Sequence, residues 1–359
     1  MTEFTASPRL RTLAMAALVT ANAITVSSLY WMQAVIAQTD AELGHSAILA
    51  TAPGAALLGY ALGVAGLACF SHDLSRPGGL AGHGILLAAA LWCLAISPNP
   101  ECVVLAALAV GAGCALTQRI LVGATTWVGE AQRAQAIGFI IASGLLGIVF
   151  ARAWVADAAI VIGWRALFVV GAAATGSACL VAAWVNPTSN AAPVVRPPMP
   201  SPLTLLRTVG ALRSAAAQQA LAFAVFHMGW ALFPAATHAS TTIRAAIASA
   251  GAVAAIVSGR ACRTLSPRIV ALTGLSTVGV ALAAAALTLS TSADTSRSAL
   301  LVAMSLVEIG TQIALVANQA RAQAAAPSLP IRGRLAAIMT TIAFGGGAAG
   351  AAIGNLLQQ

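Results

Sequence analysis

Residues 166–185 read ALFVVGAAATGSACLVAAWV, a run of twenty residues without a single charge. A helix needs about 20 mostly apolar residues to cross a bilayer, so this run predicts a membrane span. Similar runs recur from one end of the chain to the other. The sequence predicts eleven spans, at about 12–36, 46–70, 80–97, 103–126, 134–156, 160–185, 214–236, 243–262, 267–290, 298–318 and 335–356.

The overall composition excludes a soluble fold. Of the 359 residues, 59% are hydrophobic and only 8% are charged, whereas an ordinary soluble domain has about 25% charged residues. So few charges cannot cover a water-exposed surface. The sequence therefore predicts an all-α polytopic membrane protein.

Several chemistries are also excluded or disfavoured. All eighteen residues of the Lys and Arg count are arginine, so the chain lacks the lysine of a P-loop ATPase site and of Schiff-base catalysis. The six cysteines are scattered without a CxxC pair, and neither HExxH nor GxSxG occurs. We therefore expect no enzyme activity, metal or cofactor, although an intramembrane enzyme remains a less favoured alternative.

The arginines predict the orientation, because cytoplasmic loops carry the excess of positive charge. With the N-terminus inside, four arginines fall outside or near the outer surface: Arg152, Arg165, Arg244 and Arg297. Thirteen fall inside: Arg9, Arg11, Arg76, Arg133, Arg196, Arg207, Arg213, Arg260, Arg263, Arg268, Arg321, Arg332 and Arg334. Because they flank apolar runs, we expect lipid and no nucleic acid as a partner. The first run is too long for a signal peptide and is expected to stay uncleaved.

A proline-rich segment at 186–203 divides the spans and predicts an exposed cytoplasmic linker. The expected domains are a six-helix bundle at 1–185 and a five-helix bundle at 204–359. Two parallel six-helix halves, related by an axis along the membrane normal, form a known transporter plan. Cargo in that plan binds near the middle of the membrane, between the halves. Here the second half has one predicted span fewer.

Four groups of residues carry a family resemblance. They are Asn318-Gln319 with Arg332-Gly333-Arg334, Phe344-Gly345-Gly346-Gly347 and Gly350; Gly138, Ser143-Gly144-Leu145-Leu146-Gly147, Arg152 and Gly163-Trp164-Arg165; Arg119 with Gly123; and Tyr30 with Gln33. In this order the chain resembles the major facilitator superfamily, in its bacterial efflux branch of the arabinose-efflux-permease type, without the twelfth helix.

The resemblance implies a secondary active transporter of the bacterial inner membrane. Proton-coupled export of a small organic molecule (a drug, sugar or metabolite) by alternating access is the implied activity. It further implies a cytoplasmic gate made by Asp73, Arg76, Arg332 and Arg334. The loop at 69–76 departs from the family pattern in register. A non-transporting relic or accessory protein of the same fold therefore remains the alternative. Oligomeric state stays open.

Charged and polar residues inside the spans are the candidate site, because a charge in the bilayer is costly and is functional by default. Glu308, with Gln312 one turn later, could carry a proton or be a structural acid. Arg119, preceded by Gln118, could bind substrate or take part in coupling, or form a structural ion pair.

Three further residues complete the predicted substrate and proton-coupling set. His227 lies within a span, where it could shuttle a proton or serve only as a packing residue. Tyr30 and Gln33 on the first span resemble the Y-x-x-Q pattern of the branch, which implies a place in the central site.

Overall fold

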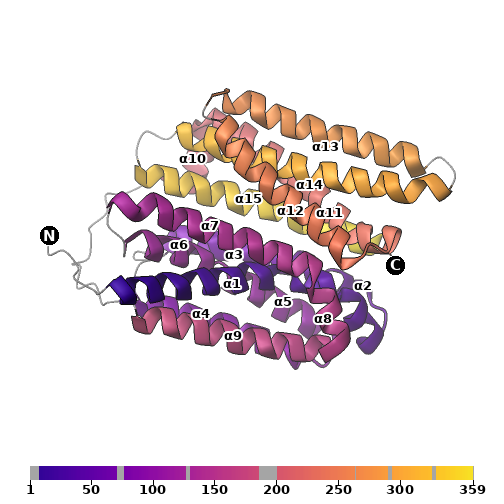
Figure 1. Ribbon diagram of the computed structural model, residues 1–359, viewed down its shortest axis with the longest axis horizontal. Helices are drawn as coiled ribbons and strands as arrows, with labels where there is room; N and C mark the ends of the chain where they lie inside the picture. The colour runs from indigo at the N-terminus through magenta and orange to yellow at the C-terminus, as the bar shows by residue number, and fades with distance from the viewer. Residues whose placement is uncertain are drawn as a thin grey trace.

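The computed structural model describes residues 8–70, 77–126, 130–185, 200–262, 264–289, 293–325 and 329–358. Within these ranges the regular secondary structure is entirely α-helical, and the long helices lie side by side (Figure 1). By length and composition, eight of the described helices can cross a membrane, and nine spans result if one bent pair is counted as a single span. The chain is thus an all-α multi-pass membrane protein.

The helices up to the predicted linker correspond to the first six predicted spans. They are α1 (Pro8–Leu43), α2 (Ala47–Ala50), α3 (Ala52–Phe70), α4 (Pro77–Ala95), α5 (Pro100–Cys114), α6 (Leu116–Thr126), α7 (Glu130–Ala153), α8 (Val155–Ile162) and α9 (Trp164–Val185). Three of the predicted spans are interrupted. Thr51 separates α2 from α3, Ala115 separates α5 from α6, and a bend of 54° at Trp154 separates α7 from α8.

The second group of helices follows the linker. They are α10 (Pro202–Thr208), α11 (Gly210–Thr237), α12 (Thr241–Ala261), α13 (Pro267–Leu289), α14 (Ala293–Ala324) and α15 (Leu329–Leu356). Residues 186–199 of the predicted linker lie outside the described residues, and its last part, from Pro202, is helical. Ser201 caps α10 by accepting a hydrogen bond from the Thr204 amide, and Pro202 occupies the first helical position.

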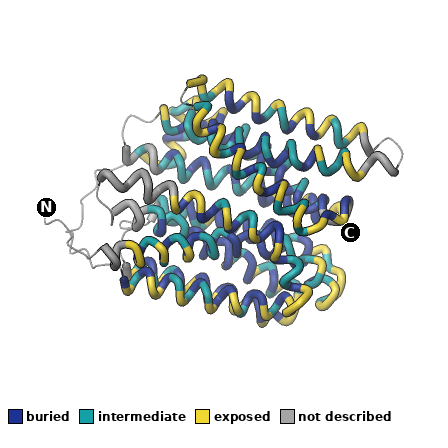
Figure 2. Tube along the Cα trace, viewed as in Figure 1, coloured by how far each residue is buried: buried dark blue, intermediate teal, exposed yellow. Residues whose placement is uncertain are grey.

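Helices α1–α9 pack mainly on one another, and so do α11–α15. We call the boundary between these two groups the seam. Two helix pairs make most of the packing across it: α3 with α15, and α7 with α12. Buried residues concentrate between the helices, while exposed positions follow the outer faces (Figure 2). We refer to the end of the molecule where α1 begins as end I, and to the end where α1 finishes as end II.

Glycines allow α15 to pack directly on the backbone of α11. A Cβ atom at Gly346 would overlap the carbonyl oxygen of Ala220, and one at Gly350 would overlap that of Ala224. Their spacing of four residues places both glycines on one face of the helix. In membranes, such small-residue faces let two helices approach closely and gain van der Waals contact.

This packing predicts that Gly350→Ala destabilises the protein, because α11 and α15 must separate to admit the methyl group. The expected loss is roughly 1–3 kcal/mol, the range for overpacked sites. Gly279→Ala on α13 is the matched control, since no atom lies within 4 Å of a Cβ at that position. Thermal unfolding of the purified protein measures both. Equal melting temperatures for the two variants would contradict the close approach of α11 and α15.

Candidate functional site

Glu308 of α14 lies at the seam and is 1% exposed. The indole Nε1 of Trp230, on α11, donates a hydrogen bond of 2.7 Å to its Oε2. Gln312 Nε2 donates a longer bond of 3.5 Å to its Oε1. Helix α12 covers the carboxyl group from another side, where Gly251 has no side chain and a Cβ would overlap Oε1. The carboxyl is therefore enclosed by three helices of the second group.

Arg152 is the cation beside Glu308, and the sequence-based interpretation misplaced it. We expected Arg152 near the outer surface, but it is 7% exposed and inside the seam. Its Cζ lies 4.0 Å from the ring centroid of Trp230, 4.9 Å from that of Phe226 and 5.1 Å from that of Tyr30. Arg152 is the residue before the last of α7, which ends at Ala153, just ahead of the bend.

His227 and the first helix complete this group. The imidazole of His227 is fully buried and stacks on the ring of Tyr30, with centroids 5.9 Å apart and an interplanar angle of 8°. Gln33, one turn after Tyr30, donates a hydrogen bond of 3.2 Å to the carbonyl oxygen of His227. Both ring nitrogens of His227 are without a hydrogen-bond partner among the described residues.

We call the following residues the seam cluster: Tyr30, Arg152, Phe226, His227, Trp230 and Glu308. Four helices supply them: α1, α7, α11 and α14. Of the predicted site residues, the structure brings together Tyr30, Gln33, His227, Glu308 and Gln312. The cluster brings an acid, a base and a guanidinium together among aromatic rings.

Arg119 and Gln118 lie elsewhere in the first group. The Arg119 guanidinium packs against the start of α4, where its Nη1 is 2.6 Å from the position of a Cβ on Gly79. Gln118 is next to the hydroxyl of Tyr60. The Tyr60 ring meets Phe344 of α15 edge to face, at a centroid distance of 4.5 Å. Gln118 therefore neighbours the α3–α15 contact, whereas Arg119 contacts helix α4.

The predicted cytoplasmic gate is described only in part. Asp73 and Arg76 lie outside the described residues, and of Arg332 only its place in α15 is described. Arg334 donates hydrogen bonds to the carbonyl oxygens of Pro200, at 2.7 Å, and of Ala68 at the end of α3, at 3.3 Å. Arg334 thus connects the two groups of helices at end I.

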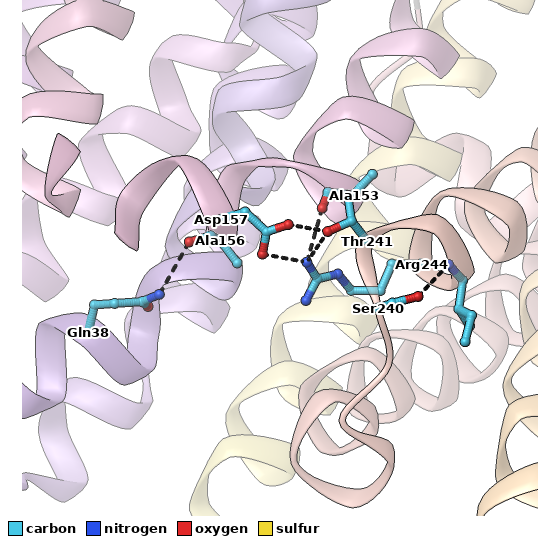
Figure 3. A network of polar contacts seen from close by, with 8 residues as sticks. Gln38, Ala153, Ala156, Asp157, Ser240, Thr241 and Arg244 are labelled. Atoms are coloured by element: carbon cyan, nitrogen blue, oxygen red, sulfur yellow. Dashed lines mark hydrogen bonds and ion pairs between the residues drawn. The ribbon is translucent and has the colours of Figure 1, made fainter. Parts of the chain in front are cut away.

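A second polar connection crosses the seam at end II. Figure 3 shows Thr241 and Arg244 of α12 pointing toward Asp157 of α8. Arg244 Nη2 lies 2.9 Å from Asp157 Oδ1 and 3.1 Å from the carbonyl oxygen of Ala153, and the Thr241 hydroxyl donates to the same carboxylate. The sequence analysis placed both charges on the same side of the membrane but did not pair them.

No protein-family model and no curated protein matches this chain. Solved structures do. A bacterial homolog of the human lysosomal transporter Spinster, inward-facing and unoccupied, matches with a TM-score of 0.75 and 17% identity, over 96% of this chain and 82% of its own. The nucleoside transporter NupG matches with a TM-score of 0.73 and 14% identity, over 96% and 90%. The xylose transporter XylE from E. coli matches with 0.68 and 11%, over 97% and 92%.

The chain has the major facilitator fold. With identities of 11–17%, what it shares with these proteins is the arrangement of the helices. In this chain the fold places the seam cluster between the two groups of helices, with a polar connection on either side of it, at end I and at end II. Around the cluster, the seam is crossed mainly by the α3–α15 and α7–α12 pairs.

Proposed function

We propose that this chain is a secondary active transporter, which exports a small organic molecule across the bacterial inner membrane by alternating access. The observation that carries the proposal is the burial of Arg152 and Glu308 at the seam of a major facilitator fold. Ionisable groups in a membrane interior are costly and typically belong to a transport pathway. Replacing buried charged residues by well-packed apolar ones is often neutral or stabilising, so stability alone gives no reason for both of them here.

Glu308 is the proposed proton carrier. A desolvated carboxyl can exist in the neutral form near neutral pH, and Glu308 is 1% exposed within the seam cluster. Its hydrogen bond from Trp230 suits either state, because an indole only donates and a carbonyl or carboxylate oxygen only accepts. Binding and loss of one proton therefore changes the charge of the cluster while the bond from Trp230 stays. A proton on Oε1 needs an acceptor, which Gln312 supplies when its side-chain amide turns to present its oxygen.

The polar connections at the two ends are the proposed gates. At end II, the Arg244–Asp157 ion pair joins side chains that are 14% and 46% exposed. Because water reaches the half-exposed Asp157 carboxylate, the attraction is screened, and this contact can break and form again in each cycle. At end I, Arg334 has the corresponding place. Asp73, Arg76 and Arg332 keep their predicted gate role, and Arg119 and Gln118 their predicted role in coupling.

We place end I in the cytoplasm, on the basis of the arginine distribution. In whole cells, a membrane-impermeant maleimide is then expected to label Thr242→Cys, an exposed position at the start of α12, and not Thr208→Cys at the end of α10. Both variants are labelled after the cells are opened. Labelling of Thr208→Cys alone in intact cells would show the opposite orientation, with end I outside.

Transport is tested with the purified full chain in proteoliposomes. An imposed pH gradient is expected to drive the movement of at least one member of a labelled panel: xylose, uridine, ethidium and 1-naphthoate. The movement should stop when a protonophore collapses the gradient. If no panel member moves faster than in protein-free liposomes, the result favours the alternative, a non-transporting relic or accessory protein of the same fold.

A further inference from the structure

We propose that the seam cluster recognises an organic anion, a carboxylate attached to an apolar or aromatic body, and that Arg152 receives the carboxylate. This names the cargo class of the transporter proposed above and rests on that function for its role in transport. The binding site itself rests only on the contacts within the cluster.

One edge of the Arg152 guanidinium is available to a ligand. Nε and Nη2 of its guanidinium have no hydrogen-bond partner among the described residues, although the side chain is 7% exposed. These two nitrogens point their N–H bonds in parallel from the same edge of the planar group. That edge fits both oxygens of a carboxylate, which is the strongest geometry available to an arginine. Buried donors of this kind are costly unless something binds them.

Glu308 does not satisfy this edge. Its two oxygens accept from Trp230 and Gln312. In the part of the chain that the structure describes, the ion pairs within 4.0 Å join Asp40 to His45, Glu42 to Arg165, and Asp157 to Arg244, and Arg152 takes part in none. Its direct hydrogen-bonding capacity remains for another acceptor.

The surroundings of Arg152 indicate what is attached to that acceptor. Aromatic rings cover the guanidinium and continue along α11 and α15, where Phe223 and Phe344 meet edge to face at a centroid distance of 5.2 Å. His227 lies within this aromatic group, 5.7 Å from the Phe223 centroid. Its two unpartnered nitrogens can donate one hydrogen bond and accept another when the ring is neutral.

These contacts separate the candidate cargo classes. A cation would meet the charge of Arg152 at close range in a medium of low dielectric, where repulsion is strong. A sugar carries many hydroxyl groups that need hydrogen-bond partners. In this cluster those groups would lie mostly against aromatic rings. A carboxylate with an apolar body satisfies the guanidinium edge and packs on the rings. This class therefore fits the cluster best.

The test measures binding and does not depend on transport. The full chain in lipid nanodiscs is titrated with three probes of one shape: 1-naphthoate, 1-naphthamide and 1-naphthylmethylamine. The readouts are the melting temperature and the tryptophan fluorescence, because Trp230 lies against Arg152. We expect the acid to bind at least tenfold more tightly than the amide or the amine. Equal binding of acid and amide, or no binding of the acid, would overturn the proposal.

Variants locate the binding site. Arg152→Gln is expected to weaken binding of the acid at least tenfold, and Arg152→Lys, which keeps the charge without the two-pronged edge, to lie between. Arg165→Gln is the matched control, since Arg165 pairs with Glu42 at end II. Unliganded melting temperatures show whether each variant folds. If Arg152→Gln does not fold, Arg152→Lys decides: unchanged affinity for the acid overturns the role of Arg152.

The two proposals fail in different ways. Selective binding of the acid without flux of any labelled panel member would contradict the transporter and leave the anion site standing. Gradient-driven flux of xylose, uridine or ethidium, together with equal binding of acid and amide, would contradict the anion site and leave the transporter standing.

Discussion

Glu308→Gln is expected to lower pH-gradient-driven transport by about a hundredfold or more, the range associated with losing a positioned proton-transfer group. Glutamine keeps an oxygen that accepts from Trp230, so the fold should persist, but its charge cannot change. The variant can therefore still bind cargo while it cannot exchange a proton. Initial rates in proteoliposomes with and without a pH gradient measure the effect.

Two controls accompany this substitution. Glu42→Gln removes a carboxylate at end II that accepts from Arg165 and Trp164, and it should leave the gradient-driven rate near that of the unmodified chain. Counterflow of labelled against unlabelled cargo, without a gradient, should survive in Glu308→Gln. Gradient-driven rates unchanged by Glu308→Gln would remove Glu308 from the coupling step.

Locking the seam at end II is expected to abolish transport almost completely. The side chains of Asp157 and Thr241 are hydrogen-bonded across the seam. In a background without the six native cysteines, Asp157→Cys with Thr241→Cys should react with a short bis-methanethiosulfonate linker. Flux should then fall to the level of protein-free liposomes, because the two groups of helices cannot separate at that end. Reduction of the linker should restore it.

A matched pair shows whether the linker itself does harm. Asp40 of α1 and His45, which lies between α1 and α2, are also in contact at end II, but both are on the same side of the seam. Linking Asp40→Cys to His45→Cys should leave the flux unchanged. Full transport by the protein linked between 157 and 241 would show that end II does not open during the cycle.

Much of the fold could be predicted from the sequence, because apolar length is a local property. Each predicted span has a helical counterpart, and the interruptions at Thr51, Ala115 and Trp154 lie inside spans predicted as continuous. Burial of Glu308 and His227 was also predictable, since each stands within an apolar stretch. These features depend on the cost of placing polar groups in lipid. The apolar residues on both sides of Glu308 and of His227 show that each lies within a span.

The place of the two arginines could not be predicted in the same way. Arg152 stands in the last turn of an apolar helix, as surface arginines at a membrane boundary do, yet its side chain is buried in the seam. Arg119 stands inside a span but contacts α4 near Gly79. Which face of a helix meets which neighbour is decided by packing between segments far apart in sequence. Hydropathy along the chain does not determine which helix faces meet.

The central claim is that the two groups of helices open alternately around a buried charged cluster. Distances between spin labels test it directly, with Gly78→Cys and Thr208→Cys across end I, and Ile162→Cys and Thr242→Cys across end II, all at exposed positions. In nanodiscs between acid and alkaline pH, we predict that one distance lengthens while the other shortens. Two distances that stay fixed, or that lengthen together, would contradict alternating access in this protein.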